Sequence, residues 1–158
     1  MQKTKPIQKQ KSDFAKQALK SKIYRKVSFK NNIYAIGETL LFKESESTEI
    51  VGKLVEIVPE GGNSAHPKWP MIGVQWYYKK SDLDYKKVGV SEEDFNKFIG
   101  ENEVFPSNHY DKVYVDCISK KCQVHTIEKY DELETIDNVT FFTRANYDPV
   151  KRVLDPPF

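Results

Sequence analysis

The chain lacks the residues and patterns that mark several large classes of protein. Only two of its 158 residues are cysteines, Cys117 and Cys122, which is too few for a disulfide framework and favours a reducing, intracellular setting. No apolar run approaches the ~18 residues that a membrane span needs. No apolar stretch follows the basic N-terminus, as it would in a signal peptide. We therefore expect no membrane partner.

The sequence is equally short of motifs for catalysis or metal binding. Its seven glycines form neither G-x-G-x-x-G nor G-x-x-x-x-G-K-[ST], the loops that hold phosphates. A Cys–His nucleophile would need a cysteine beside a histidine, but Cys117 and Cys122 lie in β-type stretches typical of a core. A zinc site from these cysteines with His125 and His109 lacks the usual paired spacing. We expect no catalytic residue, no metal and no cofactor, and hence no enzyme.

Charge divides the chain into two parts. Residues 1–30 hold ten Lys or Arg against a single acid, Asp13, whereas the remainder holds 15 Lys or Arg against 22 Asp or Glu. An acidic body repels phosphates and attracts basic partners. We therefore expect a basic, flexible leader over residues 1–22 and a folded domain over 23–158. A weak DNA contact would run through the leader, and a solvated leader without a partner is the alternative.

Short apolar runs between turn residues predict a mainly β fold. Residues 54–57 and 72–76 should pair across the Gly-rich loop that separates them. A helix should begin at Ser91, with acids in its first turn. Together the segments predict a distorted, partly closed β-barrel with short peripheral helices. A β-type stretch begins at residue 23, and about seven strands are expected after it. These strands cover residues 33–38, 39–42, 50–58, 71–78, 113–118, 122–127 and 139–144.

One candidate binding segment lies at the end of a predicted strand, over residues 73–82. Trp76 and Tyr78 are two residues apart and so project from the same face. Two rings followed by an acid, Asp82, can form a wall for an organic cation, because ring faces attract an alkylated ammonium ion. The alternative is that both rings belong to the core, where Trp and Tyr in strands usually lie.

A second candidate segment, residues 102–111, gathers polar side chains around a proline. Such a turn can hydrogen-bond an extended peptide backbone, and the alternative is a turn that satisfies its own polar groups. The residues expected to bind a peptide here are Ser107, Asn108, His109 and Asp111.

Taken in order, these segments resemble the bromo-adjacent homology (BAH) domain over about residues 22–153. The resemblance rests on the order and spacing of motifs that are individually unspecific. The matching segments are Tyr34-Ala35-Ile36-Gly37-Glu38, Ile50-Val51-Gly52-Lys53-Leu54-Val55-Glu56-Ile57, Trp76-Tyr77-Tyr78-Lys79, Asn102-Glu103-Val104-Phe105-Pro106-Ser107 with His109, Lys121-Cys122-Gln123-Val124, and Phe141-Phe142-Thr143-Arg144 with Tyr147-Asp148.

The resemblance implies a distorted β-barrel, a nuclear location and a role in chromatin. Some members of this family read methyl-lysine through an aromatic cage, and Trp76 and Tyr78 match its ring pair. Asp82 matches an acid that faces the methylammonium group in relatives. The loop that holds the peptide in the readers has the pattern Ser-x-His-x-Asp, which is matched here by Ser107, His109 and Asp111.

The chain departs from the readers at Ile50, where they carry a further aromatic residue. Each cation–π contact contributes about 0.5–2 kcal/mol, so one missing ring weakens binding roughly threefold to thirtyfold. Other aromatic residues can supply the missing wall, and Trp69 between two prolines is the first candidate. The other candidates are Tyr24, Tyr34 and Tyr85.

Two functions follow from the resemblance. The first is a module that binds a histone tail or nucleosome, with a methylated lysine between Trp76 and Tyr78. The second is a scaffold that contacts other chromatin proteins without reading methyl-lysine, which the departure at Ile50 favours.

Overall fold

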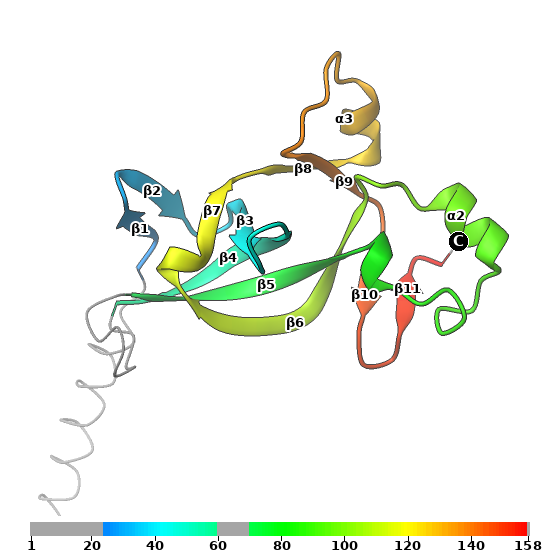
Figure 1. Ribbon diagram of the computed structural model, residues 1–158, viewed down its shortest axis with the longest axis horizontal. Helices are drawn as coiled ribbons and strands as arrows, with labels where there is room; N and C mark the ends of the chain where they lie inside the picture. Colours follow the sequence, from blue (N-terminus) through cyan, green and yellow to red (C-terminus); the bar gives the residue numbers. More distant parts are fainter. Residues whose placement is uncertain (1–23, 60–69, 158) are drawn as a thin grey trace, which may run out of the picture.

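A curved seven-stranded sheet forms the body of the molecule in a computed structural model that describes residues 24–59 and 70–157 (Figure 1). Its strand order is β11-β10-β6-β5-β4-β3-β7, and β1-β2 and β8-β9 form two smaller sheets. The predicted mainly β fold, a distorted and partly closed barrel, is confirmed. The leader, residues 1–22, lies outside the described residues, and so does a short helix that the spacing of apolar residues over 13–19 weakly indicates. The strands are β1 Lys26–Phe29, β2 Asn32–Ala35, β3 Thr39–Lys43, β4 Glu49–Val58, β5 Met71–Lys79, β6 Val104–Tyr114, β7 Ile118–Lys121, β8 Gln123–Thr126, β9 Thr140–Thr143, β10 Asn146–Asp148 and β11 Val153–Asp155.

Strands β4 and β5 pair antiparallel, as their alternating patterns predicted. Leu54 lies opposite Val74, and Ile57 lies opposite Ile72. A bulge between Leu54 and Glu56 shifts the register, so that Leu54 and Ile57 enter the same core cluster while Glu56 is exposed. The expected regular alternation across the whole strand is therefore wrong beyond Leu54, because a bulge inserts one extra residue and exchanges the two faces.

The expectation of a proline turn near residue 106 is wrong. Pro106 lies inside β6, which pairs antiparallel with β5 over most of its length. The polar segment that follows Pro106 has no apolar alternation because it is largely exposed, and that pattern is typical of a loop in sequence. The expected strand over residues 113–118 is also wrong, because β6 ends at Tyr114 and a short 3-10 helix, η2 (Val115–Cys117), leads into β7.

The helices are short and lie at the periphery. Ser91 caps α2 (Glu92–Phe98) as predicted, and its hydroxyl accepts the Asp94 N–H at 3.1 Å. A second short helix, α3, covers Ile127–Asp131. No helix in the described part of the chain is long and apolar enough to cross a membrane.

Apolar side chains are buried on both faces of the sheet. Phe42, Leu54 and Val74 belong to one cluster, while Val51 and Tyr77 from the same strands belong to another. A third cluster joins α2 to the β10–β11 hairpin, and its members are Leu83, Phe95, Ile99, Phe105, Tyr147 and Leu154. The middle of the sheet is therefore held rigidly from both sides, which fixes the side chains that project from its margins.

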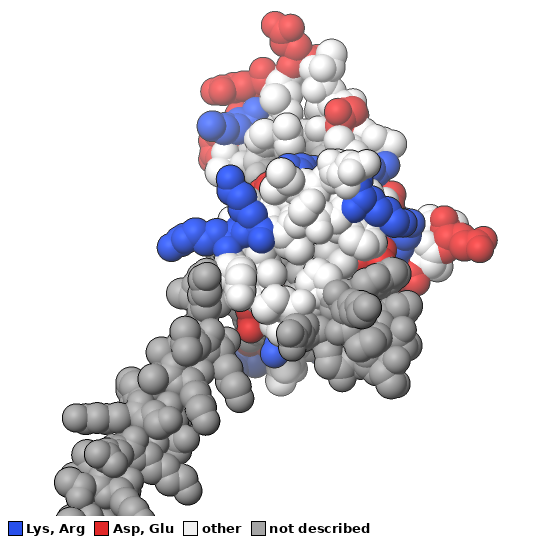
Figure 2. Space-filling model, turned by 90° about the vertical axis from the view of Figure 1, so that its left-hand side faces the viewer, with Lys and Arg blue, Asp and Glu red and all other residues white. Residues whose placement is uncertain are grey.

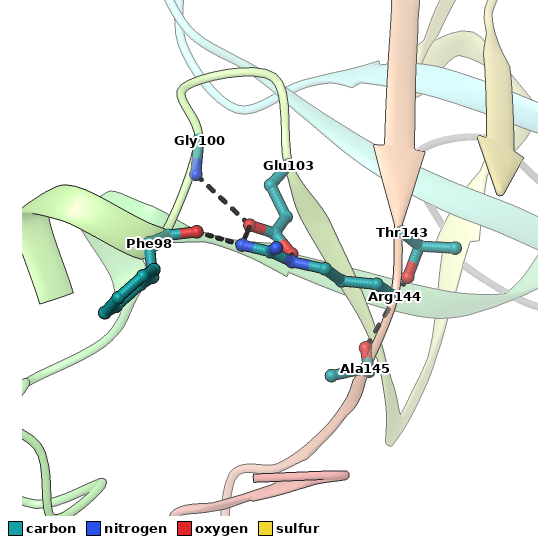
Figure 3. A network of polar contacts seen from close by, with 6 residues as sticks. All are labelled: Phe98, Gly100, Glu103, Thr143, Arg144 and Ala145. Atoms are coloured by element: carbon teal, nitrogen blue, oxygen red, sulfur yellow. Dashed lines mark hydrogen bonds and ion pairs between the residues drawn. The ribbon is translucent and has the colours of Figure 1, made fainter. Parts of the chain in front are cut away.

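A buried ion pair connects α2, β6 and β9 (Figure 3). Glu103 is fully buried, and its two carboxylate oxygens accept Arg144 Nε at 2.7 Å and Arg144 Nη2 at 3.1 Å. One oxygen also accepts the Gly100 N–H at 3.1 Å, and Arg144 Nη2 donates to the Phe98 carbonyl. The guanidinium group therefore satisfies a buried carboxylate and the end of α2 at the same time.

Candidate functional site

A pocket of about 160 Å³ opens beside the aromatic end of β5. Gly52 of β4 pairs with Trp76 of β5 in an antiparallel register. Ile50, two residues before Gly52, and Tyr78, two residues after Trp76, therefore lie next to each other and project from the same face as Trp76. This hollow, which we call the aromatic pocket, is lined by Ile50, Trp76, Tyr77, Tyr78, Asp82 and His109. The structure thus brings together all four residues that the sequence singled out for a cage, and it adds His109.

Trp76 is half-buried and held by contacts on its inner side. Its ring meets Phe42 edge-on, with 5.2 Å between ring centroids and 81° between the planes. Gly52 makes this contact possible, because a Cβ at that position would lie 2.9 Å from Phe42 Cε2. The Ser107 hydroxyl donates to the Trp76 carbonyl at 2.7 Å. One part of the indole therefore belongs to the core and another part faces the pocket.

Tyr78 is held by two neighbouring rings. Its hydroxyl lies 2.9 Å from His109 Nδ1, and its ring lies 5.1 Å from that of Tyr147, between centroids. Burial raises the pKa of Tyr78, and the neighbouring Tyr147 and Asp82 raise it further. The phenol consequently stays neutral at physiological pH and lines the pocket without a charge of its own.

Asp82 supplies a negative charge at the pocket. It ends a single 3-10 turn, η1 (Lys80–Asp82), directly after β5. Its Oδ2 accepts the Lys79 N–H at 3.0 Å, which orients the carboxylate. The side chain is exposed. Solvent and salt therefore screen its charge, but the carboxylate can still attract a cation that enters the opening.

The bulge in β6 separates the residues that were expected to bind a peptide. Tyr77 pairs with Pro106 and Gln75 pairs with Tyr110, so three residues of β6, numbers 107–109, stand opposite Trp76 alone. Ser107 is buried and its hydroxyl is taken up by Trp76, while its carbonyl accepts the Gln75 amide at 2.7 Å. Ser107 therefore supports Trp76 from behind and is only 4% exposed, at the groove between β6 and the β10–β11 hairpin.

The other members of this group lie in different places. His109 lines the aromatic pocket, whereas Asn108 lines a separate groove of about 440 Å³ between β6 and the β10–β11 hairpin. There the backbone N–H groups of Lys151 and Val150, together with the Asn108 amide, hold the pKa of Asp148 below its usual value. Asp111 lines neither cavity. The four residues thus lie at different places along β6, and their binding of a peptide stays a prediction.

The missing third ring is not supplied by any described candidate. Tyr34 of β2 is buried in the main core cluster, Tyr85 packs on Phe95 of α2, and Tyr24 precedes β1. Trp69, the first candidate, lies outside the described residues. His109 occupies the side of the pocket next to Tyr78. Local sequence could not predict this position, because it depends on the bulge in β6.

The two cysteine thiols are held in their protonated form. Burial raises the pKa of the Cys122 thiol to about 11, which keeps it protonated at physiological pH. Burial also raises the pKa of the Cys117 thiol. Across residues 24–59 and 70–157, no three His, Cys, Asp or Glu side chains are grouped so as to hold a metal ion.

Comparisons with known proteins agree on one family. The family model described as "BAH domain" matches residues 32–157. The chromatin remodeling protein SHL of Arabidopsis thaliana is 30% identical over 122 residues, which cover 76% of this chain and 48% of that protein. The chromatin remodeling protein EBS of the same plant is 23% identical over 128 residues, which cover 80% and 49%. The chain thus spans about half the length of the curated relatives it matches.

A solved structure shares the fold. The crystal structure of the yeast Rsc2 BAH domain superposes with a TM-score of 0.58 at 17% identity, and the match covers 83% of this chain and 52% of that one. At this level of identity the likeness concerns the fold alone.

Proposed function

This chain belongs to the BAH domain family, and we propose that it is a chromatin-binding module that holds a methylated lysine of a histone tail in its aromatic pocket. Its relatives SHL and EBS are chromatin remodeling proteins by name, which supports a chromatin role and a nuclear location. A binding module without catalytic activity also fits the absence of recognisable catalytic motifs in the sequence.

The observation that carries the proposal is the joint placement of two rings and a carboxylate around one small opening. Trp76 and Tyr78 present aromatic surface there, and Asp82 presents charge. A methylated ammonium ion loses little by leaving water and gains about 0.5–2 kcal/mol from each ring face. An unmodified lysine is more strongly hydrated and gains less from such a pocket, so methylation determines affinity.

The acidic body supports a basic peptide as the ligand. Residues 31–158 hold seven more acidic than basic side chains, and long-range attraction of this kind speeds association with basic segments. In this proposal His109 closes one side of the pocket and Ser107 positions Trp76. The exposed Asn108 and Asp111 contact the peptide outside the pocket.

Replacement of Ile50 by tyrosine tests the proposal as a gain of function. Ile50 is half-buried and lines the aromatic pocket from β4, so a tyrosine there adds a third ring face. We expect Ile50→Tyr to bind a trimethyl-lysine histone peptide about threefold to thirtyfold more tightly than the original chain. The measurement is calorimetric titration with matched methylated and unmodified peptides.

The control for this experiment is Val58→Tyr, which adds a ring on the same strand but outside the pocket. It should leave the affinity unchanged. If Ile50→Tyr folds and binds no better than the original chain, the pocket is not a cage. If neither protein prefers the methylated peptide, the scaffold function, docking of another chromatin protein, is supported in its place.

A further inference from the structure

The β1–β2 hairpin forms a basic projection at one end of the molecule (Figure 1). Arg25, Lys26 and Lys30 lie on or beside it and are exposed. No acid occurs between residues 24 and 37. Within the described ranges, none of these three cations takes part in a salt bridge. Their charges are therefore available to an external anion.

The hairpin is a rigid support for these charges. Val27 and Tyr34 face each other across it and are buried in the main core cluster. Lys30 and Asn31 form its turn with φ of 48° and 65°, a left-handed pair that fits the twist of a two-residue hairpin. Packing on one face therefore fixes the opposite face, which carries Lys26 and Ser28.

The spacing of the cations suits a nucleic-acid duplex. Lys30 follows Lys26 by four positions, which span at most about 13 Å along a strand. This span is close to the ~12 Å width of the major groove of B-DNA, whose two phosphate backbones form its margins. Flexible lysine side chains and the Ser28 hydroxyl can reach phosphate oxygens without reading base sequence.

The charges on the hairpin itself favour an anion there. Figure 2, which faces the end that carries β1 and β2, shows Lys and Arg side chains at mid-height, with Asp and Glu gathered above them and also at the right-hand margin. Two acids beside β3 are paired, because Glu38 lies 3.0 Å from Lys121 and Glu49 lies 3.8 Å from Lys120. Glu44 and Glu46 of the β3–β4 loop and Glu56 of β4 are exposed. The leader that precedes the hairpin adds seven lysines in the sequence against one acid.

We propose that the β1–β2 hairpin binds the phosphate backbone of duplex DNA through Arg25, Lys26 and Lys30. β5 runs away from the region of the hairpin (Figure 1), and Trp76 and Tyr78 lie in its second half. None of Arg25, Lys26 and Lys30 lines the aromatic pocket, so the two surfaces share no residue. The module then holds a histone tail and nearby nucleosomal DNA at the same time, and each contact raises the effective concentration of the other.

The test measures the binding of a fluorescent duplex of about 20 base pairs to the full chain at several salt concentrations. Replacement of Arg25, Lys26 and Lys30 together by glutamine should weaken binding at least about tenfold. It should also reduce the slope of log K against log salt by about 2 to 3, since each phosphate contact contributes about 0.9. All three side chains are exposed, and a thermal melt checks that the fold is kept.

The matched control removes the same charge from the opposite end, by replacing Lys86, Lys87 and Lys97 with glutamine. These lysines are exposed in and beside α2, and their loss should change the slope by less than about 1. Equal losses in both triple variants, or no loss in the hairpin variant, would overturn the proposal. Binding of a methylated peptide by the hairpin variant is measured separately, so a failure of the cage is distinguished from a failure of the hairpin.

Discussion

Replacement of Trp76 by leucine is expected to abolish most of the binding to a methylated histone peptide, with a loss of about thirtyfold or more. The indole provides the largest ring face of the aromatic pocket, and buried aromatic anchors commonly contribute about 2 kcal/mol or more to an interface. Leucine keeps apolar volume against Phe42 but removes the ring face that attracts a cation. The measurement is calorimetric titration of both proteins with the same peptide.

Two further variants separate binding from folding. Tyr78→Leu should weaken binding of the same peptide by a similar factor. Because Tyr78 packs on Tyr147 and not on Phe42, the two variants disturb different parts of the core. Tyr110→Ala is the control, because Tyr110 is a highly exposed aromatic on β6 that lies outside the aromatic pocket. If well-folded Trp76→Leu and Tyr78→Leu proteins bind as tightly as the original chain, the rings are core residues and the cage does not exist.

Replacement of Arg144 by alanine is expected to lower the free energy of unfolding by about 3 kcal/mol. Glu103 is completely buried and depends on Arg144 for both of its oxygens (Figure 3). Removal of one partner leaves an uncompensated buried charge, which costs about 3–5 kcal/mol in proteins. The lower part of this range applies because the Arg144 side chain is 38% exposed. Urea denaturation measures the change.

The double variant Glu103→Gln with Arg144→Ala shows whether charge is the cause. Glutamine cannot ionise and can still accept the Gly100 N–H, so the double variant should be more stable than Arg144→Ala alone. The free energy of unfolding of Arg144→Lys should lie between those of the original chain and Arg144→Ala, since lysine keeps the charge but loses the bidentate contact. A loss below about 1 kcal/mol in Arg144→Ala would contradict a stabilising role for the network.

Local sequence was enough to predict the elements that build the aromatic pocket. Two β-prone segments on either side of a Gly-rich loop predicted the pairing of β4 with β5, and the two-residue spacing of Trp76 and Tyr78 put their rings on one face. These predictions succeed because strands that follow each other in sequence commonly pair. The capping of α2 by Ser91 succeeds because it depends on neighbours in sequence.

Features that depend on distant strands could not be predicted. The bulge of β6 opposite Trp76 and the bulge near Leu54 in β4 arise from register between strands, which no local pattern contains. Consequently local sequence could not predict that Ser107 is buried or that His109 lines the aromatic pocket. The parallel pairing of β8 with β9 and the partnership of Glu103 with Arg144 are likewise contacts between separated segments.

The most direct measurement compares two peptides that differ only in charge. One carries trimethyl-lysine, and the other carries its uncharged isostere, with a tert-butyl group in place of the trimethylammonium head. Both fill the opening between Trp76 and Tyr78 equally well, but only the first is attracted by ring faces and by Asp82. Calorimetry should show the charged peptide binding at least about tenfold more tightly. Equal affinities for the two peptides would contradict recognition of a cation in this pocket.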